Sequence, residues 1–126
     1  MDKVPELGRY REMLRQLRPT ELYARGCKVE NLDTLKGLTG LQWLDLSDSP
    51  ALKNVDGLKG LTTLQTLDLW GCRALQNADV LKSLTALQKL YIGGCDKIPA
   101  TALRELRAAL PKTDITFPDG TMNPPQ

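Results

Sequence analysis

The sequence predicts an α/β solenoid in which short repeated units stack side by side and share one core. Three nearly identical segments begin at Leu35, Leu58 and Leu81, a period of 23 residues (58 − 35 and 81 − 58). Within the units, segments such as 44–46 and 67–69 alternate apolar and polar residues, which is typical of strands with one buried face. A fixed period of about 20 to 50 residues indicates units that bury their apolar faces only by stacking. We therefore expect a short parallel sheet on the concave face and short return segments on the convex face.

Length and composition place the whole chain, residues 1–126, in a single domain. With 41% hydrophobic residues it can bury a core, and 17 basic against 15 acidic residues give a formal net charge of +2. Charges of both signs are interspersed, so the basic stripe that nucleic acid requires is missing and we expect no nucleic-acid partner. A charged amino terminus and no run of about 18 apolar residues predict no membrane partner. We expect a cytoplasmic protein, or one exported without a cleaved signal peptide.

Cysteine and histidine usage argues against several kinds of site. Cys27, Cys72 and Cys95 are an odd number without a C-x-x-C pair, and the sequence has no histidine. This argues against a disulfide framework and a zinc site. The chain also has no phosphate-cradling glycine loop and no pocket-forming insertion between units. We therefore expect no cofactor, no metal and no small-molecule substrate, and we predict that the protein is not an enzyme.

Aligning the repeats gives the unit Leu-x-x-Leu-x-Leu-x-x-Cys-x-x-Leu-x-x-x-x-x-Leu-x-x-Leu. In the unit that starts at position 64, the defining residues are Leu64, Leu67, Leu69, Cys72, Leu75, Leu81 and Leu84. This pattern resembles the leucine-rich repeat family over about residues 20–117, with a Cys variant at a position that is often Asn. The Lys-x-Leu-Thr-x-Leu-Gln run looks like internalin-type bacterial repeats, which are usually one residue shorter. The resemblance implies a solenoid whose cysteine column, with Ser49, points inward and donates to backbone, and it suggests a bacterial source.

The amino-terminal part and the return segments have their own signals. Residues 1–19 are expected to form a helical cap that ends at Pro19, because apolar residues follow helical spacing at Val4, Leu7, Tyr10, Met13, Leu14 and Leu17. Residues 20–98 hold the repeats, and their return segments suit short 3₁₀ helices. The expected helix caps are Asp33, Asp56 and Asp79, and the expected turn residues are Asn31, Asn54 and Asn77.

The carboxyl-terminal part is expected to close the stack. Within residues 99–117 a helix should run over 102–110, with Thr101 in the cap position and Pro111 after its end. A last strand is expected over 114–117. Residues 118–126 are rich in proline and small polar residues, and we expect them to be a disordered tail.

The polar strand positions should form three columns across the concave face. They are Glu21, Trp43, Thr66 and Lys89; then Tyr23, Asp45, Asp68, Tyr91 and Asp114; then Arg25, Ser47, Trp70 and Gly93. Both tryptophans and two of the three tyrosines lie here, although aromatic residues make up only 5% of the chain. Exposed aromatic rings with charged neighbours are typical of a recognition surface. The predicted partner-binding residues are Tyr23, Arg25, Trp43, Asp45, Asp68, Trp70, Lys89 and Tyr91.

Each of these residue sets also has a structural interpretation. The rings could simply cover strand backbone and pack on one another. Asp45 and Asp68 should lie about 5 Å apart on neighbouring strands. This spacing could serve a hydrolase or hold a cation, but no third ligand and no pocket are implied. The cysteines could include a reactive thiol or a disulfide between Cys72 and Cys95, although no nearby cation would lower a thiol pKa. The lysine column of Lys36, Lys59 and Lys82 fits a solvated face.

The sequence therefore predicts a non-enzymatic module that binds another protein through its concave aromatic and acidic face. The alternative is a regulatory or structural subunit whose aromatic face is buried in a permanent complex or homodimer. A monomer is favoured, and a basic or apolar protrusion on the partner would fit the acidic strip.

Overall fold

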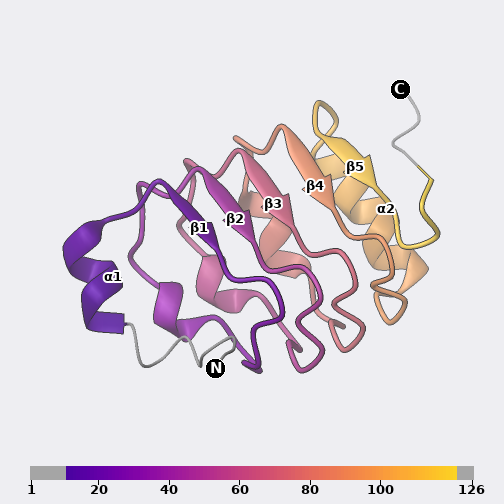
Figure 1. Cartoon of the computed structure of the whole chain (residues 1–126). Coiled ribbons are helices and arrows are strands. Elements are labelled where there is room, and N and C mark those ends of the chain that lie inside the picture. Colours follow the sequence, from indigo (N-terminus) through magenta and orange to yellow (C-terminus); the bar gives the residue numbers. More distant parts are fainter. Residues whose placement is uncertain (1–10, 122–126) are drawn as a thin grey trace.

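The computed structural model describes residues 11–121, which form a solenoid of stacked repeats (Figure 1). Five short strands lie side by side in chain order in one parallel sheet. They are β1 (Glu21–Tyr23), β2 (Trp43–Asp45), β3 (Thr66–Asp68), β4 (Lys89–Tyr91) and β5 (Asp114–Thr116). Each strand belongs to one unit, so the predicted parallel sheet is confirmed.

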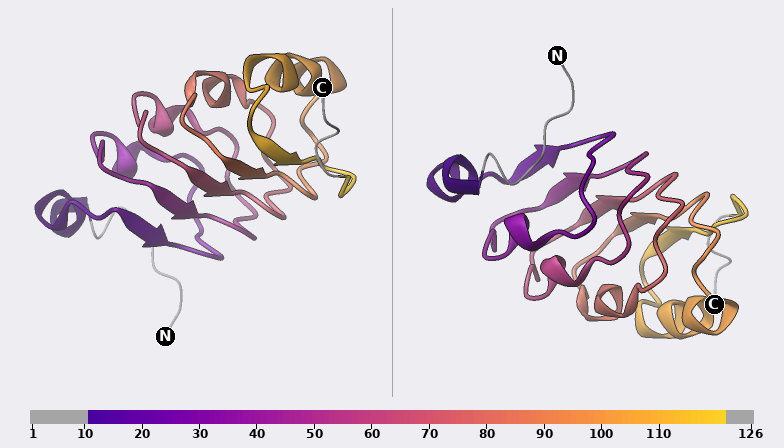
Figure 2. Two further views of the ribbon diagram at one scale, coloured as in Figure 1. Left: turned by 90° about the horizontal axis from the view of Figure 1, so that it is seen from above. Right: turned by 90° about the horizontal axis from the view of Figure 1, so that it is seen from below.

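Short helices form the opposite face, as Figure 2 shows from above and below. The return segments hold the 3₁₀ helices η2 (Asp33–Leu35), η3 (Asp56–Leu58) and η4 (Asp79–Ser83), and α2 (Ala100–Ala109) continues the row beside the last strand. The first helix, α1 (Arg11–Leu17), lies at the other end of the stack. This arrangement matches the fold class that the repeat pattern predicts.

The core is a ladder of leucines that runs the length of the stack. The central residues of four neighbouring strands, Leu44, Leu67, Leu90 and Ile115, lie in register and are fully buried. Leu22 of β1 is only partly buried and packs against this core. Because the middle residue of each strand points inward, the residues on either side of it must point outward from the concave face.

The cysteine column is buried, as the resemblance implied. The Cys72 thiol donates to the Leu46 carbonyl at 3.2 Å, and the Cys95 thiol donates to the Leu69 carbonyl at 3.1 Å, each in the preceding unit. Ser49 donates instead to Leu46 in its own unit, at 2.7 Å. Burial raises the pKa of Cys72 to about 11 and that of Cys95 to about 12. Cys72 and Cys95 form no disulfide, so the disulfide alternative is wrong.

The capping prediction is wrong for the aspartates and right for the asparagines. Each aspartate is the first residue of its 3₁₀ helix, and the residue before it makes no side-chain cap hydrogen bond. The asparagine two positions earlier accepts the aspartate N–H instead, at 3.0 to 3.1 Å, in the pairs Asn31 to Asp33, Asn54 to Asp56 and Asn77 to Asp79. Thr101 also lies inside its helix, because α2 begins at Ala100 directly after Pro99.

The two ends differ in part from expectation. In α1 Leu14 is buried, but Met13 and Leu17 are 53% and 66% exposed, so they are not on a buried face. Val4, Leu7 and Tyr10 lie outside the described residues. At the carboxyl end, Phe117 donates its N–H to Thr121 at 2.8 Å, and Gly94 donates to Pro118 at 2.9 Å. Positions 118–121 thus belong to a hydrogen-bonded turn, and the rest of the expected tail, residues 122–126, lies outside the described residues.

Candidate functional site

The concave face is the array of outward-pointing residues from the five strands and the turns that follow them. The strand register aligns Glu21, Trp43, Thr66 and Lys89 in one column and Tyr23, Asp45, Asp68 and Tyr91 in the next, as expected. Asp114 is the exception, since it pairs with Lys89 in the first column, and Thr116 pairs with Tyr91 in the second. The reason is that Ile115, the buried centre of β5, fixes which residues of that strand face outward.

The turns after the strands hold the third column in place. Each turn donates a backbone N–H to the next unit: Gly26 to Ser47 at 2.8 Å, Asp48 to Trp70 at 2.6 Å, and Gly71 to Gly93 at 2.8 Å. The sheet ladder therefore continues past the strands. The surface is built on backbone that is already hydrogen-bonded, so the positions from which its side chains project are preorganised.

The large aromatic rings of this face are exposed to solvent. Tyr23 is 61% exposed, Trp43 is 42% exposed and Trp70 is 47% exposed. Tyr23 and Trp43 contact each other, with ring centroids 6.3 Å apart and an interplanar angle of 42°. Tyr91 is more enclosed and only partly exposed. The prediction that the tryptophans project from the concave face instead of packing inside the core is confirmed.

Trp70 also rests on the turn that follows the neighbouring strand, β4. A Cβ atom placed on Gly93 would lie 2.2 Å from Cζ3 and 2.4 Å from Cε3 of the indole. The ring therefore occupies the space that a side chain at position 93 would need. The alternative that the aromatic rings merely cover backbone therefore holds in part, because one side of this indole lies on the backbone of Gly93. The other side faces solvent and stays available.

The two paired aspartates have a structural task. Asp45 accepts hydrogen bonds from both the backbone N–H and the hydroxyl of Ser47, at 2.9 and 2.7 Å. Asp68 accepts the backbone N–H of Trp70 at 2.9 Å. Each carboxylate thus closes the turn that follows its strand, with Oδ1 as the acceptor. Burial raises the pKa of Asp68 despite the opposing effect of the Trp70 N–H, and the nearby charge of Asp45 raises it further.

The remaining charged residues of the face differ in how they are held. Arg25 donates to Asp48 Oδ2 from Nη2 at 2.9 Å and from Nε at 3.2 Å. Asp48 has a φ of 58° at a turn where other units place Gly26, Gly71 and Gly94. Lys89 is exposed and lies in register between Thr66 and Asp114. Sequence reasoning missed Asp48, although its place in a column of glycines was a readable signal.

Acidic groups dominate this face. The columns carry the carboxylates of Glu21, Asp45, Asp68 and Asp114, while Arg25 is already paired with Asp48. Glu21 accepts the Tyr23 hydroxyl at 2.9 Å, and this hydrogen bond is the main reason that the pKa of Tyr23 is raised. Within residues 11–121 no cluster of side chains suited to a metal ion is present. The face is therefore aromatic and acidic, and it suits a cationic ligand.

Repeat geometry, sheet topology and core together define a leucine-rich repeat solenoid of the α/β class. Among solved structures, the chain is similar to a leucine-rich repeat protein of Leptospira interrogans, with a TM-score of 0.68 and 27% identity. The match covers 85% of this chain and 27% of that one, so this chain spans about a quarter of the length of its neighbour. No family model and no curated protein matches the sequence. In the described part of the chain, no helix has both the length and the hydrophobicity to cross a bilayer.

Proposed function

We propose that this chain is a non-enzymatic binding module that captures a protein partner through the concave face. The observation that carries the proposal is the placement of two half-exposed indoles on one rigid sheet, on either side of the carboxylates of Asp45 and Asp68. The similarity to a leucine-rich repeat protein supports a display scaffold of this kind.

The chemistry of the face favours a partner that presents lysine or arginine. A cation near an indole face gains about 0.5 to 2 kcal/mol, and a nearby carboxylate adds to this attraction. The turns use Oδ1 of Asp45 and of Asp68 as the acceptor. Among the hydrogen bonds of residues 11–121, Oδ2 of each carboxylate has no donor, so it can accept from a ligand. Arg25 and Lys89 lie at the margins of this strip and would set the register of the partner.

The same charge pattern argues against a homodimer through this face. A two-fold interface places the same patch of both copies in contact. The carboxylates of Glu21, Asp45 and Asp68 would then meet like charges, which is destabilising. Sedimentation of the isolated chain at micromolar concentration should therefore give the monomer mass. A dimer that the double variant W43A/W70A dissociates would instead support the permanent-assembly alternative.

The test of the proposal compares two double variants that each remove exposed apolar side chains. W43A/W70A removes the indoles, and the control M13A/L17A removes exposed apolar side chains of α1, outside the sheet. Immobilised wild-type chain and both variants are exposed to native lysate, and captured proteins are then purified and titrated. We expect binding to be lost only in W43A/W70A and to weaken as salt rises. Equal loss in both variants, or binding that salt does not affect, would contradict the proposal.

A further inference from the structure

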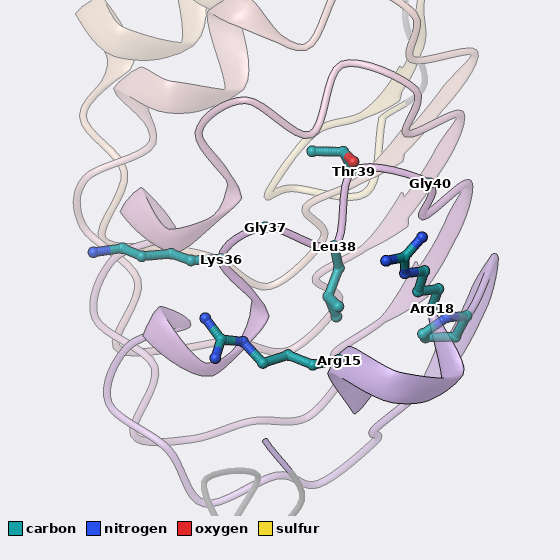
Figure 3. A pocket seen from close by; sticks show the side chains of 8 residues that line it. Arg15, Arg18, Lys36, Gly37, Leu38, Thr39 and Gly40 are labelled. Carbon is teal, nitrogen blue, oxygen red and sulfur yellow. The ribbon is translucent and has the colours of Figure 1, made fainter. Parts of the chain in front are cut away.

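A hollow of about 600 Å³ lies at the amino-terminal end of the solenoid (Figure 3). The residues that line it are Arg15, Arg18, Pro19, Lys36, Gly37, Leu38, Thr39 and Gly40. One wall is α1 with the turn that follows it, and the other wall is the loop after η2. We call this space the amino-terminal hollow. Its volume is in the range of sites for small molecules, about 300 to 1,000 Å³.

The hollow exists because loop 36–40, which belongs to the first unit, has no preceding repeat unit beside it, whereas the corresponding loops of later units do. Inside the stack, the Thr63 hydroxyl of the next unit donates to Thr39 at 2.6 Å and to Leu41 at 2.9 Å, so one side of the first loop is covered. On the other side, the place of a preceding unit is taken by α1. A single short helix does not fill the space that a whole repeat would fill, and the glycine-containing loop 36–40 stays open.

Positive charge gathers in this space. In Figure 3 the guanidinium group of Arg18 extends toward Thr39 and Gly40, and that of Arg15 extends toward the opposite, Lys36 end of the hollow. From residue 11 to residue 121, neither guanidinium has an ion pair or a side-chain hydrogen bond, and no carboxylate lines the hollow. Lys36 sits at the rim. Its ammonium points away from the arginines and lies 3.5 Å from Asp33 Oδ1.

The backbone that holds Arg18 is in an unfavourable conformation for an arginine. Arg18 follows the last turn of α1, donates its N–H to Leu14 at 3.0 Å and has a φ of 49°. This left-handed position at the end of a helix is usually occupied by glycine, because a Cβ atom is disfavoured there. The sequence keeps an arginine where a glycine would be more stable, and the side chain reaches the hollow. Such a conflict points to a role for the side chain.

The opposite wall offers backbone donors. A Cβ atom on Gly37 or on Gly40 would meet no atom within 4 Å, so the backbone is open on that side. Neither the Gly37 nor the Gly40 amide donates to a protein acceptor in the described part of the chain. An arginine beside open backbone amides suits a tetrahedral oxyanion, because the planar fork of arginine makes paired hydrogen bonds to it.

We propose that the amino-terminal hollow binds the phosphate group of a small soluble molecule. Arg18 and the open amides of the loop hold the phosphate oxygens, and Arg15 adds positive charge at the other end of the hollow. This site is independent of the concave face and of any protein partner.

The first test titrates the full chain with pyrophosphate and with inorganic phosphate in a calorimeter at low salt. We expect saturable binding to the wild type. The Kd for pyrophosphate should rise about tenfold or more in R18Q, as for the loss of charge-assisted hydrogen bonds, and further in R15Q/R18Q. The controls R73Q and K112Q remove exposed cations elsewhere and should leave the Kd unchanged. No saturable binding, or equal weakening in the controls, would overturn the proposal.

The second test separates binding from folding. R18G removes the guanidinium and relieves the left-handed backbone, so it should raise the melting temperature while it weakens pyrophosphate binding about tenfold or more. A more stable variant with undiminished affinity would overturn the role of Arg18.

The third test measures binding of the chain to vesicles of phosphatidylcholine with and without phosphatidic acid. Arginine-dependent binding to the phosphatidic acid vesicles, without any response to pyrophosphate, would overturn the soluble ligand in favour of a lipid headgroup.

Discussion

Substituting Gly93 by alanine should displace the indole of Trp70 and little else. The new Cβ would lie 2.2 Å from Cζ3, 2.4 Å from Cε3 and 2.7 Å from Cη2 of the ring. Carbon atoms in ordinary contact are about 3.5 Å or more apart, so the ring must move by about 1.3 Å or more. Gly93 does not have a positive φ, and its backbone therefore accepts alanine. The clash is with a surface side chain that can swing away, not with backbone.

The cost to stability follows from the burial of that ring. A tryptophan buries about 150 to 250 Å² when enclosed, and Trp70 keeps 47% of its surface exposed. If the shift re-exposes about 50 Å², the loss is about 1 kcal/mol at roughly 25 cal/mol per Å². Replacing glycine by alanine returns about 0.4 to 1 kcal/mol by restricting the unfolded chain. The two effects nearly cancel, so G93A should unfold within about 1 kcal/mol of the wild type.

The assay reads the indole directly. In a W43F background, Trp70 is the only tryptophan, and its emission should shift to the red in G93A as the ring gains contact with water. G93A should also bind the protein partner with lower affinity than the W43F background does. The matched control is G40A, where a Cβ would meet no atom within 4 Å. Unchanged emission and unchanged affinity in G93A would refute the claim that Trp70 is seated on the neighbouring unit and belongs to the binding face.

Three further predictions concern the packing and titration of the stack. G57A places a Cβ atom 2.1 Å from the Leu32 carbonyl oxygen, so it should destabilise the fold by about 1 to 3 kcal/mol in urea unfolding, and a neutral effect would contradict the close stacking of the units. The buried thiols of Cys72 and Cys95 bind their protons more tightly in the folded state, so their contribution to the free energy of unfolding is complete below pH 9 and should be lost as pH rises through about 11 and 12. The variant C72A/C95A should flatten this alkaline decline in stability, and a decline identical to that of the wild type would contradict the argument. D68N keeps the acceptor for the Trp70 N–H and removes a half-buried charge on a group whose pKa is raised. At pH 7 the variant should unfold at a slightly higher urea concentration than the wild type and bind a cationic partner less well. A loss of stability would refute the burial argument.

The fold could be predicted from the sequence because its signal is repeated. The same leucine positions recur in every unit, and each recurrence independently indicates one buried strand residue, as Leu44, Leu67 and Leu90 demonstrate. The asparagine turns follow from side-chain chemistry that acts within a few residues, and the buried cysteines follow from the resemblance of the repeat pattern to a known family. The outward direction of Trp43 and Trp70 followed from the two-residue period alone.

The errors lie where the repeat ends or where backbone conformation decides. Asp114 was placed in the wrong column because only the burial of Ile115 sets the register of a strand outside the repeat. The aspartates were assigned as caps because spacing alone does not separate the first residue of a 3₁₀ helix from the residue before it. The amino-terminal hollow could not be predicted, since it depends on the space that α1 leaves unfilled and on the left-handed conformation of Arg18.

The most direct test of the binding face follows the two indole N–H resonances of Trp43 and Trp70 by NMR during titration with an unstructured peptide rich in lysine and arginine. We predict that both signals shift together and saturate at one concentration, and that a glutamate-rich peptide of equal length leaves them in place. Shifts confined to residues of η2, η3 and α2, with both indole signals unmoved, would contradict the assignment of the concave face as the site of recognition.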